Sequence, residues 1–307
     1  MEQKSHILIT GFAETCIENG LYGVSRENIN LISNINLNDI VYIYDKKNKK
    51  LNGPFFVKTD LYFDETEVWR ITKKNKELYP YRISFNYDKN YYIEDSSILW
   101  ELYWNKNENL LPISTSNKSV ITLFPKDSKL LFEKIKSKNN LLKYVKPIIE
   151  NPNVSPFDYL KNWTTNKIKK EFHEADLEYF ILKNQEKFIE FLCKKCNIDI
   201  DENAILYNQV TLPVHNFTMD LFLVNDINDT SENLIIVELK QPKIDEETIK
   251  QLRLYKEYFR EFKKITLIAI GSKFDDKDYK DTFQIKYEIT KDKKVKLTSK
   301  NGEEVDL

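Results

Sequence analysis

The pattern of apolar and polar residues predicts two different arrangements of helices and strands along this chain. In the first half, short alternating runs separated by turn residues predict the order β-α-α-β-β-β, which is typical of a small β-barrel with helices. In the second half the predicted order is α-β-β-β-α-β, with helices at 172–196 and 246–262 and strands at 204–212, 217–224, 234–240 and 264–270. A hairpin over 285–298 is expected to join the edge of that second sheet.

A proline-rich stretch separates these two regions. Pro147, Pro152 and Pro156 lie within ten residues, which is the composition of a linker. The chain has 307 residues, a length that favours two domains. The predicted fold class is therefore α/β and α+β in two domains, residues 1–150 and 151–307.

Composition limits the class of protein but does not select a function. Residues of the hydrophobic class make up 41% and aromatic residues 13%, enough for packed cores. No apolar run approaches membrane-spanning length and the N-terminus does not resemble a signal peptide, so we expect a soluble cytoplasmic protein without a membrane partner. The net charge of −1 neither supports nor excludes DNA as a partner. Cys193 and Cys196 form a C-x-x-C pair, but no second ligand pair follows, so a structural role is favoured over zinc.

The strongest candidate site lies at the ends of two predicted strands of the second half. Asp220 falls within an alternating strand, and Glu238 and Lys240 follow a run, 234–237, that is apolar at every position. Such a run is typical of a central strand covered on both faces, and residues two apart on a strand share a face. Two acids and a lysine on one face are the groups that a magnesium- or manganese-dependent phosphodiester hydrolase requires. The alternative is a solvated ion pair between neighbouring strand residues.

The same residues resemble a known family of nucleases. Asp220, seventeen intervening residues and then Glu238-Leu239-Lys240 resemble the D-(x)n-(D/E)-x-K motif of PD-(D/E)XK nucleases, although Met219 stands where many members have proline. The resemblance implies a restriction-endonuclease-like αβββαβ core. It also implies that Asp220, Glu238 and the backbone carbonyl of Leu239 hold Mg²⁺ or Mn²⁺, and that Lys240 orients the attacking water.

Two further segments resemble the NucS-type members of that family. Gln251 and Tyr255 look like their Q-x-x-x-Y element, which implies that these residues position the phosphate or the loop around it. The helix that begins H-E-A-D-L resembles the family's S-E-x-D-L segment, which implies that Glu174 adds a carboxylate to the site. Glu178 lies one turn further on the same helix face and is the alternative. Tyr255 has an alternative role as a core residue.

The first half contains the segments G-L-Y-G-V-S at 20–25, I-N-L-N-D-I-V-Y-I-Y at 35–44 and V-W-R at 68–70. With these motifs it resembles an EVE domain of the PUA/YTH superfamily. Such domains accept a flipped, modified base between aromatic side chains, which restore part of the stacking that the base loses. The resemblance implies that the base-binding residues are Tyr22, Val24, Ser25 and Trp69. The alternative is that these aromatic residues belong to the barrel interior.

Together the two resemblances imply a modification-dependent DNA endonuclease of the kind used in restriction and defence against phages. Its expected partner is double-stranded DNA with modified bases, and a homodimer is expected by analogy with enzymes that cut both strands. One alternative is a NucS-like endonuclease specific for mismatched or branched DNA. The other is a non-catalytic protein that binds modified nucleic acid.

Overall fold

The computed structural model describes eight stretches of the chain and divides it into two compact units. Those stretches are residues 3–69, 79–87, 93–95, 119–138, 172–201, 204–211, 218–226 and 229–307. Unit 1 comprises Met1–Phe157 with Leu212–His215, and unit 2 comprises Asp158–Thr211 with Asn216–Leu307. Two domains are consistent with this division. The predicted boundary at residue 150 lies outside the described residues.

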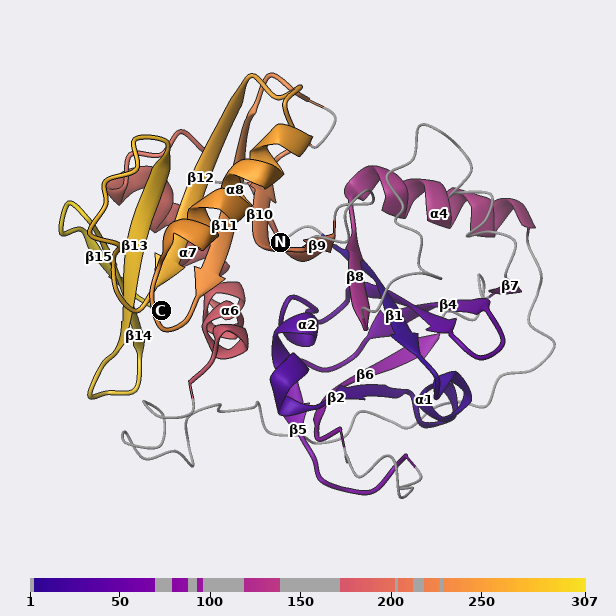
Figure 1. Cartoon of the computed structure of the whole chain (residues 1–307). Helices are drawn as coiled ribbons and strands as arrows, with labels where there is room; N and C mark the ends of the chain where they lie inside the picture. Colours follow the sequence, from indigo (N-terminus) through magenta and orange to yellow (C-terminus); the bar gives the residue numbers. More distant parts are fainter. Residues whose placement is uncertain are drawn as a thin grey trace. The chain divides into compact units, whose positions relative to one another are not determined.

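Unit 1 is built on a curled eight-stranded sheet that forms a half-barrel, drawn from indigo to magenta in Figure 1. The strand order is β2-β6-β4-β3-β1-β8, with β5 paired to β6 and β7 paired to β4. The strands are β1 (Ser5–Thr10), β2 (Leu21–Val24), β3 (Ile40–Asp45), β4 (Lys50–Val57), β5 (Tyr62–Phe63), β6 (Tyr81–Tyr87), β7 (Ile93–Asp95) and β8 (Val120–Leu123). The helices are α1 (Ala13–Asn19), α2 (Ile29–Ser33) and α4 (Pro125–Lys138), with a 3-10 turn at Arg26–Asn28.

One cluster of buried residues in unit 1 lies between the sheet and α4. Ile7 and Ile9 of β1 and Tyr42 of β3 face the same interior as Leu131 and Ile135 of α4. Ile7 and Ile9 are two apart, so alternation places them on one face, and Tyr42 pairs directly with Ile7 in the β1–β3 ladder. The mixed β–α composition expected for this region is therefore observed.

Two strands of unit 1 differ from the sequence-based prediction. The polar segment K-K-N-K-K-L-N-G-P at 46–54 favours a turn, but β4 begins within it at Lys50, and Leu51 is fully buried. Strand β2 lies between α1 and α2, where the predicted order β-α-α-β-β-β has no strand. It pairs with β6, and its Gly23 is required there because a Cβ atom would lie 2.5 Å from the carbonyl oxygen of Tyr79 and 2.7 Å from the Trp69 ring.

Unit 2 is built on a seven-stranded mixed sheet in the order β15-β14-β13-β12-β11-β10-β9. The pairs β11–β12 and β12–β13 are parallel, and the remaining pairs are antiparallel. The strands are β9 (Ile205–Thr211), β10 (Thr218–Val224), β11 (Asn233–Lys240), β12 (Lys264–Gly271), β13 (Thr282–Ile289), β14 (Val295–Ser299) and β15 (Glu304–Asp306). The helices are α6 (Glu174–Lys183), α7 (Gln185–Glu190) followed by a wide π-turn at Phe191–Lys195, and α8 (Glu246–Tyr258).

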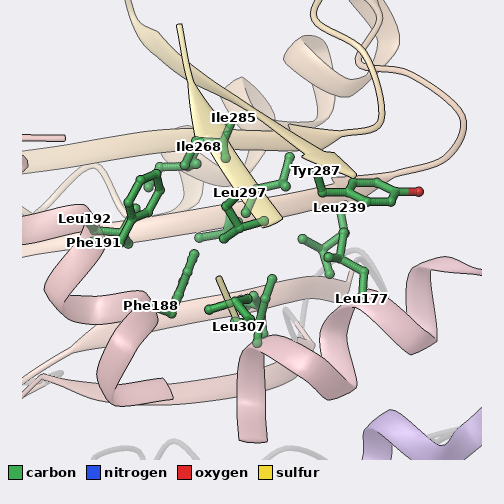
Figure 2. Close-up of a cluster of buried hydrophobic side chains, with 14 of the residues drawn as sticks. Leu177, Phe188, Phe191, Leu192, Leu239, Ile268, Ile285, Tyr287, Leu297 and Leu307 are labelled. Carbon is green, nitrogen blue, oxygen red and sulfur yellow. The ribbon is translucent and has the colours of Figure 1, made fainter. Parts of the chain in front are cut away.

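Helices cover both faces of the central strands of this sheet. Residues two apart on β11, such as Ile235 and Val237, pack with Leu177 of α6 and Phe188 of α7. Figure 2 shows Leu177 and Phe188 in this interior together with Leu239 of β11 and other sheet residues of the same cluster. On the other face, Phe222 of β10 packs against Phe259 at the end of α8, with ring centroids 5.3 Å apart. The all-apolar run of β11 follows from burial on both faces.

The element order α-β-β-β-α-β of unit 2 agrees with the prediction, and four local features add to it or differ from it. The single helix expected over 172–196 is interrupted at Asn184, and α8 ends at Tyr258, before residue 262. The predicted hairpin is present, but its first strand β13 pairs in parallel with β12. Strand β15, which was not predicted, forms the edge beyond it. Within the described residues, no helix is both long enough and apolar enough to cross a lipid bilayer.

Candidate functional site

Strand register brings Asp220 and Glu238 together in unit 2. Leu221 pairs with Val237 in the antiparallel β10–β11 ladder, so the next two positions are Asp220 and Glu238. Directly opposite residues of an antiparallel pair project from the same face of the sheet. Lys240, two residues further along β11, shares that face, and its Nζ atom lies 2.8 Å from Oε1 of Glu238. The three residues predicted from the sequence therefore form one cluster.

Asp220 also caps the end of the ladder between its own strand and β11. Its Oδ2 atom accepts a hydrogen bond from the backbone N–H of Leu239 at 2.7 Å. In a strand, the N–H and C=O groups of one residue point to the same edge, so the carbonyl of Leu239 is directed toward the Asp220 side. This arrangement fits the predicted use of that carbonyl as a ligand.

Glu238 has one carboxylate oxygen that no protein group satisfies in the described part of the chain. The residue is only 1% exposed, and although Oε1 accepts from Lys240, Oε2 is buried without a hydrogen-bond partner there. A buried acceptor left unpaired costs about 1–3 kcal/mol. Such an atom is a natural ligand position for a cation.

The charges of the cluster perturb one another. Burial raises the pKa of both Asp220 and Glu238 above the ordinary carboxyl range. The nearby charge of Asp220 raises the pKa of Glu238 further. Burial lowers the pKa of Lys240, but the neighbouring Glu238 carboxylate outweighs this and the net shift is upward. Perturbed titratable groups gathered in this way are typical of functional sites.

Helix α6 brings two carboxylates to this region, in different environments. Oε1 of Glu174 accepts a hydrogen bond from the backbone N–H of Gln241 at 2.9 Å, directly after β11. Its charge is close enough to raise the pKa of Asp220 and of Glu238. Glu178 is buried and accepts hydrogen bonds from the side-chain amides of Asn208 at 3.0 Å and Gln209 at 2.8 Å. Glu174 is thus near the cluster, whereas Glu178 is bound to β9.

Gln251 and Tyr255 of α8 lie next to each other at the same site. Nε2 of Gln251 donates to the Tyr255 hydroxyl at 2.5 Å, and that hydroxyl donates to the carbonyl oxygen of Thr218 on β10 at 2.8 Å. Tyr255 is fully buried, and burial followed by the charge of Glu238 raises the pKa of its hydroxyl. The Tyr255 ring therefore lies in the core and its hydroxyl lies close to the charged cluster, while the role that the resemblance implies for Gln251 and Tyr255 stays a prediction.

The segment after Lys240 is held close to the sheet. A Cβ atom on Gly271, the partner of Lys240 on β12, would lie 2.9 Å from the backbone nitrogen of Ile244. Asp245 then caps α8 by accepting the backbone N–H of Thr248 at 2.9 Å. This close approach fixes the path of the chain from Lys240 to the helix that carries Gln251 and Tyr255.

Sequence reasoning missed Gln209, which contacts the cluster from β9. Its Nε2 atom lies 3.4 Å from Oδ1 of Asp220 and 2.8 Å from Oε2 of Glu178. Its backbone φ is +53°, in the left-handed region. Nothing in the local pattern Y-N-Q-V indicates this conformation, because a polar residue in a half-buried strand is unremarkable.

Of the four predicted base-binding residues of unit 1, Tyr22, Val24 and Trp69 are buried and Ser25 is partly exposed. Tyr22 is 4% exposed and donates its hydroxyl proton to the carbonyl oxygen of Ser119 at 2.9 Å. Trp69 is 3% exposed, packs edge-on against Tyr79 and stacks with the Arg82 guanidinium 5.2 Å from its ring centre. The two other predicted base-binding residues are Val24, which is buried, and Ser25, which accepts a hydrogen bond from Asn28 at 3.0 Å.

The donor set determines which cation the cluster fits. Among the described residues there is no group of three or more His, Cys, Asp or Glu side chains placed to hold one metal ion. The site instead offers Asp220, Glu238 and the Leu239 carbonyl. A hard cation such as Mg²⁺ is commonly bound by one or two carboxylates, with water and substrate phosphate completing the shell. The unsatisfied Oε2 atom of Glu238 fits such an ion.

Comparisons with known proteins add no identification. No model of a known protein family matches the chain, and no curated protein matches it. The nuclease and EVE-domain resemblances therefore stay predictions from the sequence.

Proposed function

We propose that unit 2 is a divalent-metal-dependent hydrolase of phosphodiester bonds in DNA. The observation that carries the proposal is the Asp220–Glu238–Lys240 cluster, in which one buried oxygen of Glu238 has no hydrogen-bond partner among the described residues. Two carboxylates on one face, that of Glu238 buried and that of Asp220 partly buried, repel each other unless a proton or a cation compensates their charge. A lysine beside them supplies only one positive charge, so the set favours an additional cation.

Each residue has a role that follows from its position. Asp220 and Glu238 would hold Mg²⁺ or Mn²⁺ together with the carbonyl of Leu239. The bound ion would supply Lewis-acid polarisation of the phosphate and a lowered pKa for an attacking water. Lys240 has three N–H donors, of which one contacts Glu238, and its side chain is 27% exposed. The remaining donors are free to orient water or to stabilise charge on a phosphate oxygen.

Three neighbouring residues would support this chemistry. Glu174 adds negative charge near the two carboxylates, which favours a cation there. Gln251 and Tyr255 connect α8 to the first residue of β10 and so set the distance between the helix and the charged face. In this proposal they position the site rather than bind the ion.

The second part of the proposal is that unit 1 selects DNA carrying a modified base, and the enzyme is then a modification-dependent endonuclease. Support for this part comes from the sequence resemblance and from the contact between the Gly23 segment and Trp69. The described contacts of Tyr22 and Trp69 are those of a packed interior, so base entry would require these side chains to move. Homodimerisation, with one site for each DNA strand, belongs to the same proposal.

The test is cleavage of phage DNA with modified cytosines and of its unmodified counterpart, with and without Mg²⁺ or Mn²⁺. Three proteins are compared: wild type, Lys240→Ala and the control Lys264→Ala, which removes an exposed lysine paired with Asp199 at 2.8 Å. We expect metal-dependent cleavage that Lys240→Ala abolishes and Lys264→Ala retains. Cleavage that persists in Lys240→Ala contradicts the proposed site.

The choice of DNA separates the alternatives. Cleavage restricted to modified DNA supports the proposed role of unit 1. Equal cleavage of modified and unmodified DNA contradicts that role. Cleavage of unmodified mismatched or branched duplexes favours the NucS-like alternative. Binding of modified nucleic acid without any cleavage favours the non-catalytic alternative.

A further inference from the structure

Gln209 has an unusual backbone conformation directly opposite Asp220. The β9–β10 register passes from the Val210–Met219 pair to the Asn208–Leu221 pair, which leaves Gln209 facing Asp220. At this position φ is +53°, a conformation that residues other than glycine seldom adopt within a strand. Residues held in sparsely populated conformations cluster at functional sites, where surrounding contacts impose them.

The left-handed conformation changes the direction of the Gln209 side chain. Neighbouring residues of a regular strand point to opposite faces of the sheet. Here, however, Asn208 and Gln209 both donate hydrogen bonds to the carboxylate of Glu178, at 3.0 Å and 2.8 Å. The positive φ of Gln209 within β9 breaks the regular alternation and lets two consecutive side chains reach one carboxylate of α6.

The same amide group also reaches the proposed metal site. Nε2 of Gln209 lies 3.4 Å from Oδ1 of Asp220, while Oδ2 of that carboxylate accepts from Leu239 at 2.7 Å. A primary amide has two hydrogens, so one is available for each of the two carboxylates. Asp220 is therefore held from both sides, by the backbone of β11 and by a side chain of β9.

We propose that Gln209 is a positioning residue that orients Asp220 for cation binding, with Glu178 as its anchor. The inference rests on the proposed function of the Asp220–Glu238 site. It assigns Glu178 a role different from the predicted alternative: its carboxylate holds Gln209 and is not itself a ligand. Groups that orient a ligating carboxylate from outside the metal shell typically contribute 10–100-fold to metal affinity.

The substitution that tests this is Gln209→Gly. Glycine adopts positive φ without strain, so the variant removes the side-chain amide and leaves the backbone conformation accessible. The matched control is Asn208→Ala, which removes the neighbouring amide from Glu178 while Gln209 still contacts Asp220. Mn²⁺ binding to the full-length chain is measured by the electron paramagnetic resonance signal of free Mn²⁺, and metal-free unfolding is followed in parallel.

We expect the Mn²⁺ dissociation constant to rise about tenfold or more in Gln209→Gly and to stay near the wild-type value in Asn208→Ala. The metal-free unfolding midpoint of Gln209→Gly should remain close to that of Asn208→Ala, because each variant removes one amide from Glu178. If wild type and Gln209→Gly bind Mn²⁺ equally, the inference is wrong and the proposed function is unaffected. If Asn208→Ala loses as much affinity as Gln209→Gly, the role of Gln209 is only to pack β9 against α6.

The same titration separates this inference from the proposed function. A wild-type protein that binds no Mn²⁺ would overturn both. A wild-type protein that binds Mn²⁺ but cleaves no DNA would overturn the proposed hydrolysis alone, and the comparison of the two variants would still decide the role of Gln209.

Discussion

The carboxylate of Asp220 lies 2.7 Å from the backbone nitrogen of Leu239, at the point where the β10–β11 ladder stops. One side chain thus replaces a ladder hydrogen bond and also faces Glu238 across the two strands. Asp220 is therefore both a structural acceptor and a proposed cation ligand. Substitutions that separate these two roles test the site most directly.

Asp220→Asn should lower metal-dependent cleavage while leaving the free energy of unfolding almost unchanged. Asparagine keeps an oxygen that accepts from Leu239, so the free energy of unfolding should stay close to that of wild type. Asp220→Ala leaves that N–H group without its acceptor and should cost about 1–3 kcal/mol. Metal-dependent cleavage should fall in both variants by at least the roughly 10–100-fold that loss of a metal-orienting group costs. Urea denaturation and cleavage rates check this, and full activity in Asp220→Asn would exclude its carboxylate as a ligand.

Local periodicity was sufficient to place the proposed catalytic face. The apolar run 234–237 predicted a strand covered on both sides, and the spacing of Glu238 and Lys240 predicted their shared face. These features depend on strand geometry alone, which repeats every two residues. The relation of Asp220 to Glu238 required the register between β10 and β11, which the sequence indicated only through resemblance to a family.

Features that depend on tertiary contacts were not predictable in the same way. Gln209 adopts its left-handed conformation beside Glu178, a residue 31 positions away in the chain. The polar segment before β4 read as a turn, yet burial of Leu51 extends the strand through it. The interruption at Asn184 falls within a sequence that continues to favour helix, N-Q-E-K-F-I-E. At Gln209 and Leu51 tertiary contacts override local propensity, and nothing in the local sequence explains the break at Asn184.

The stability of the metal-free protein should fall as the pH rises. Burial raises the pKa of Glu238 and Asp220 in the folded state, so the folded protein keeps protons that the unfolded chain has released. The free energy of unfolding therefore decreases from the unfolded carboxyl pKa, about 4, up to the raised folded value, by at most about 1.4 kcal/mol per pH unit for each group. Above the folded value this contribution is constant.

Glu238→Gln should flatten that pH dependence, because its amide does not titrate. Urea denaturation in EDTA from pH 5 to 9 measures the effect, and the stability of the variant relative to wild type should increase as the pH rises. Glu246→Gln is the control, since the exposed Glu246 carboxylate has a pKa lowered by Lys277. Parallel curves for wild type and Glu238→Gln would show that Glu238 is ionised throughout.

Gly271→Ala should disturb the segment that follows Lys240. The added Cβ atom would lie 2.9 Å from both the backbone nitrogen and Cγ1 of Ile244, closer than real contacts allow. Because a backbone atom cannot move aside as a side chain does, we expect a loss of about 1–3 kcal/mol in stability, as for other overpacked positions. Metal-dependent cleavage should fall as well, since the path from Lys240 to α8 shifts.

Gly11→Ala is the matched control for that experiment. An added Cβ atom at Gly11 meets nothing within 4 Å among the described residues, so stability should change by no more than about 0.5 kcal/mol. Thermal denaturation of the two variants beside wild type makes the comparison. Equal midpoints for Gly271→Ala and wild type would show that the 241–245 segment can shift without loss of folding stability.

Arg82→Lys should destabilise unit 1 although it keeps the positive charge. The guanidinium of Arg82 is fully buried and donates to Asp64 at 2.7 Å, to the Thr66 carbonyl at 2.5 Å and to the Tyr79 carbonyl at 3.1 Å. A lysine ammonium cannot reproduce this planar fork and leaves at least one carbonyl unsatisfied, which costs about 1–3 kcal/mol.

Trp69 makes this loss observable, because the Arg82 guanidinium stacks on its ring. The fluorescence of the variant should change together with a lower urea midpoint for unit 1. Arg253→Lys is the control. The Arg253 guanidinium donates two hydrogen bonds to Asp281, at 2.8 Å and 2.9 Å, but it is exposed. The urea midpoint of this variant should therefore remain that of wild type. An unchanged midpoint in Arg82→Lys would mean that water satisfies the carbonyls beside Trp69, and that this part of the interior is open enough to admit a polar ligand.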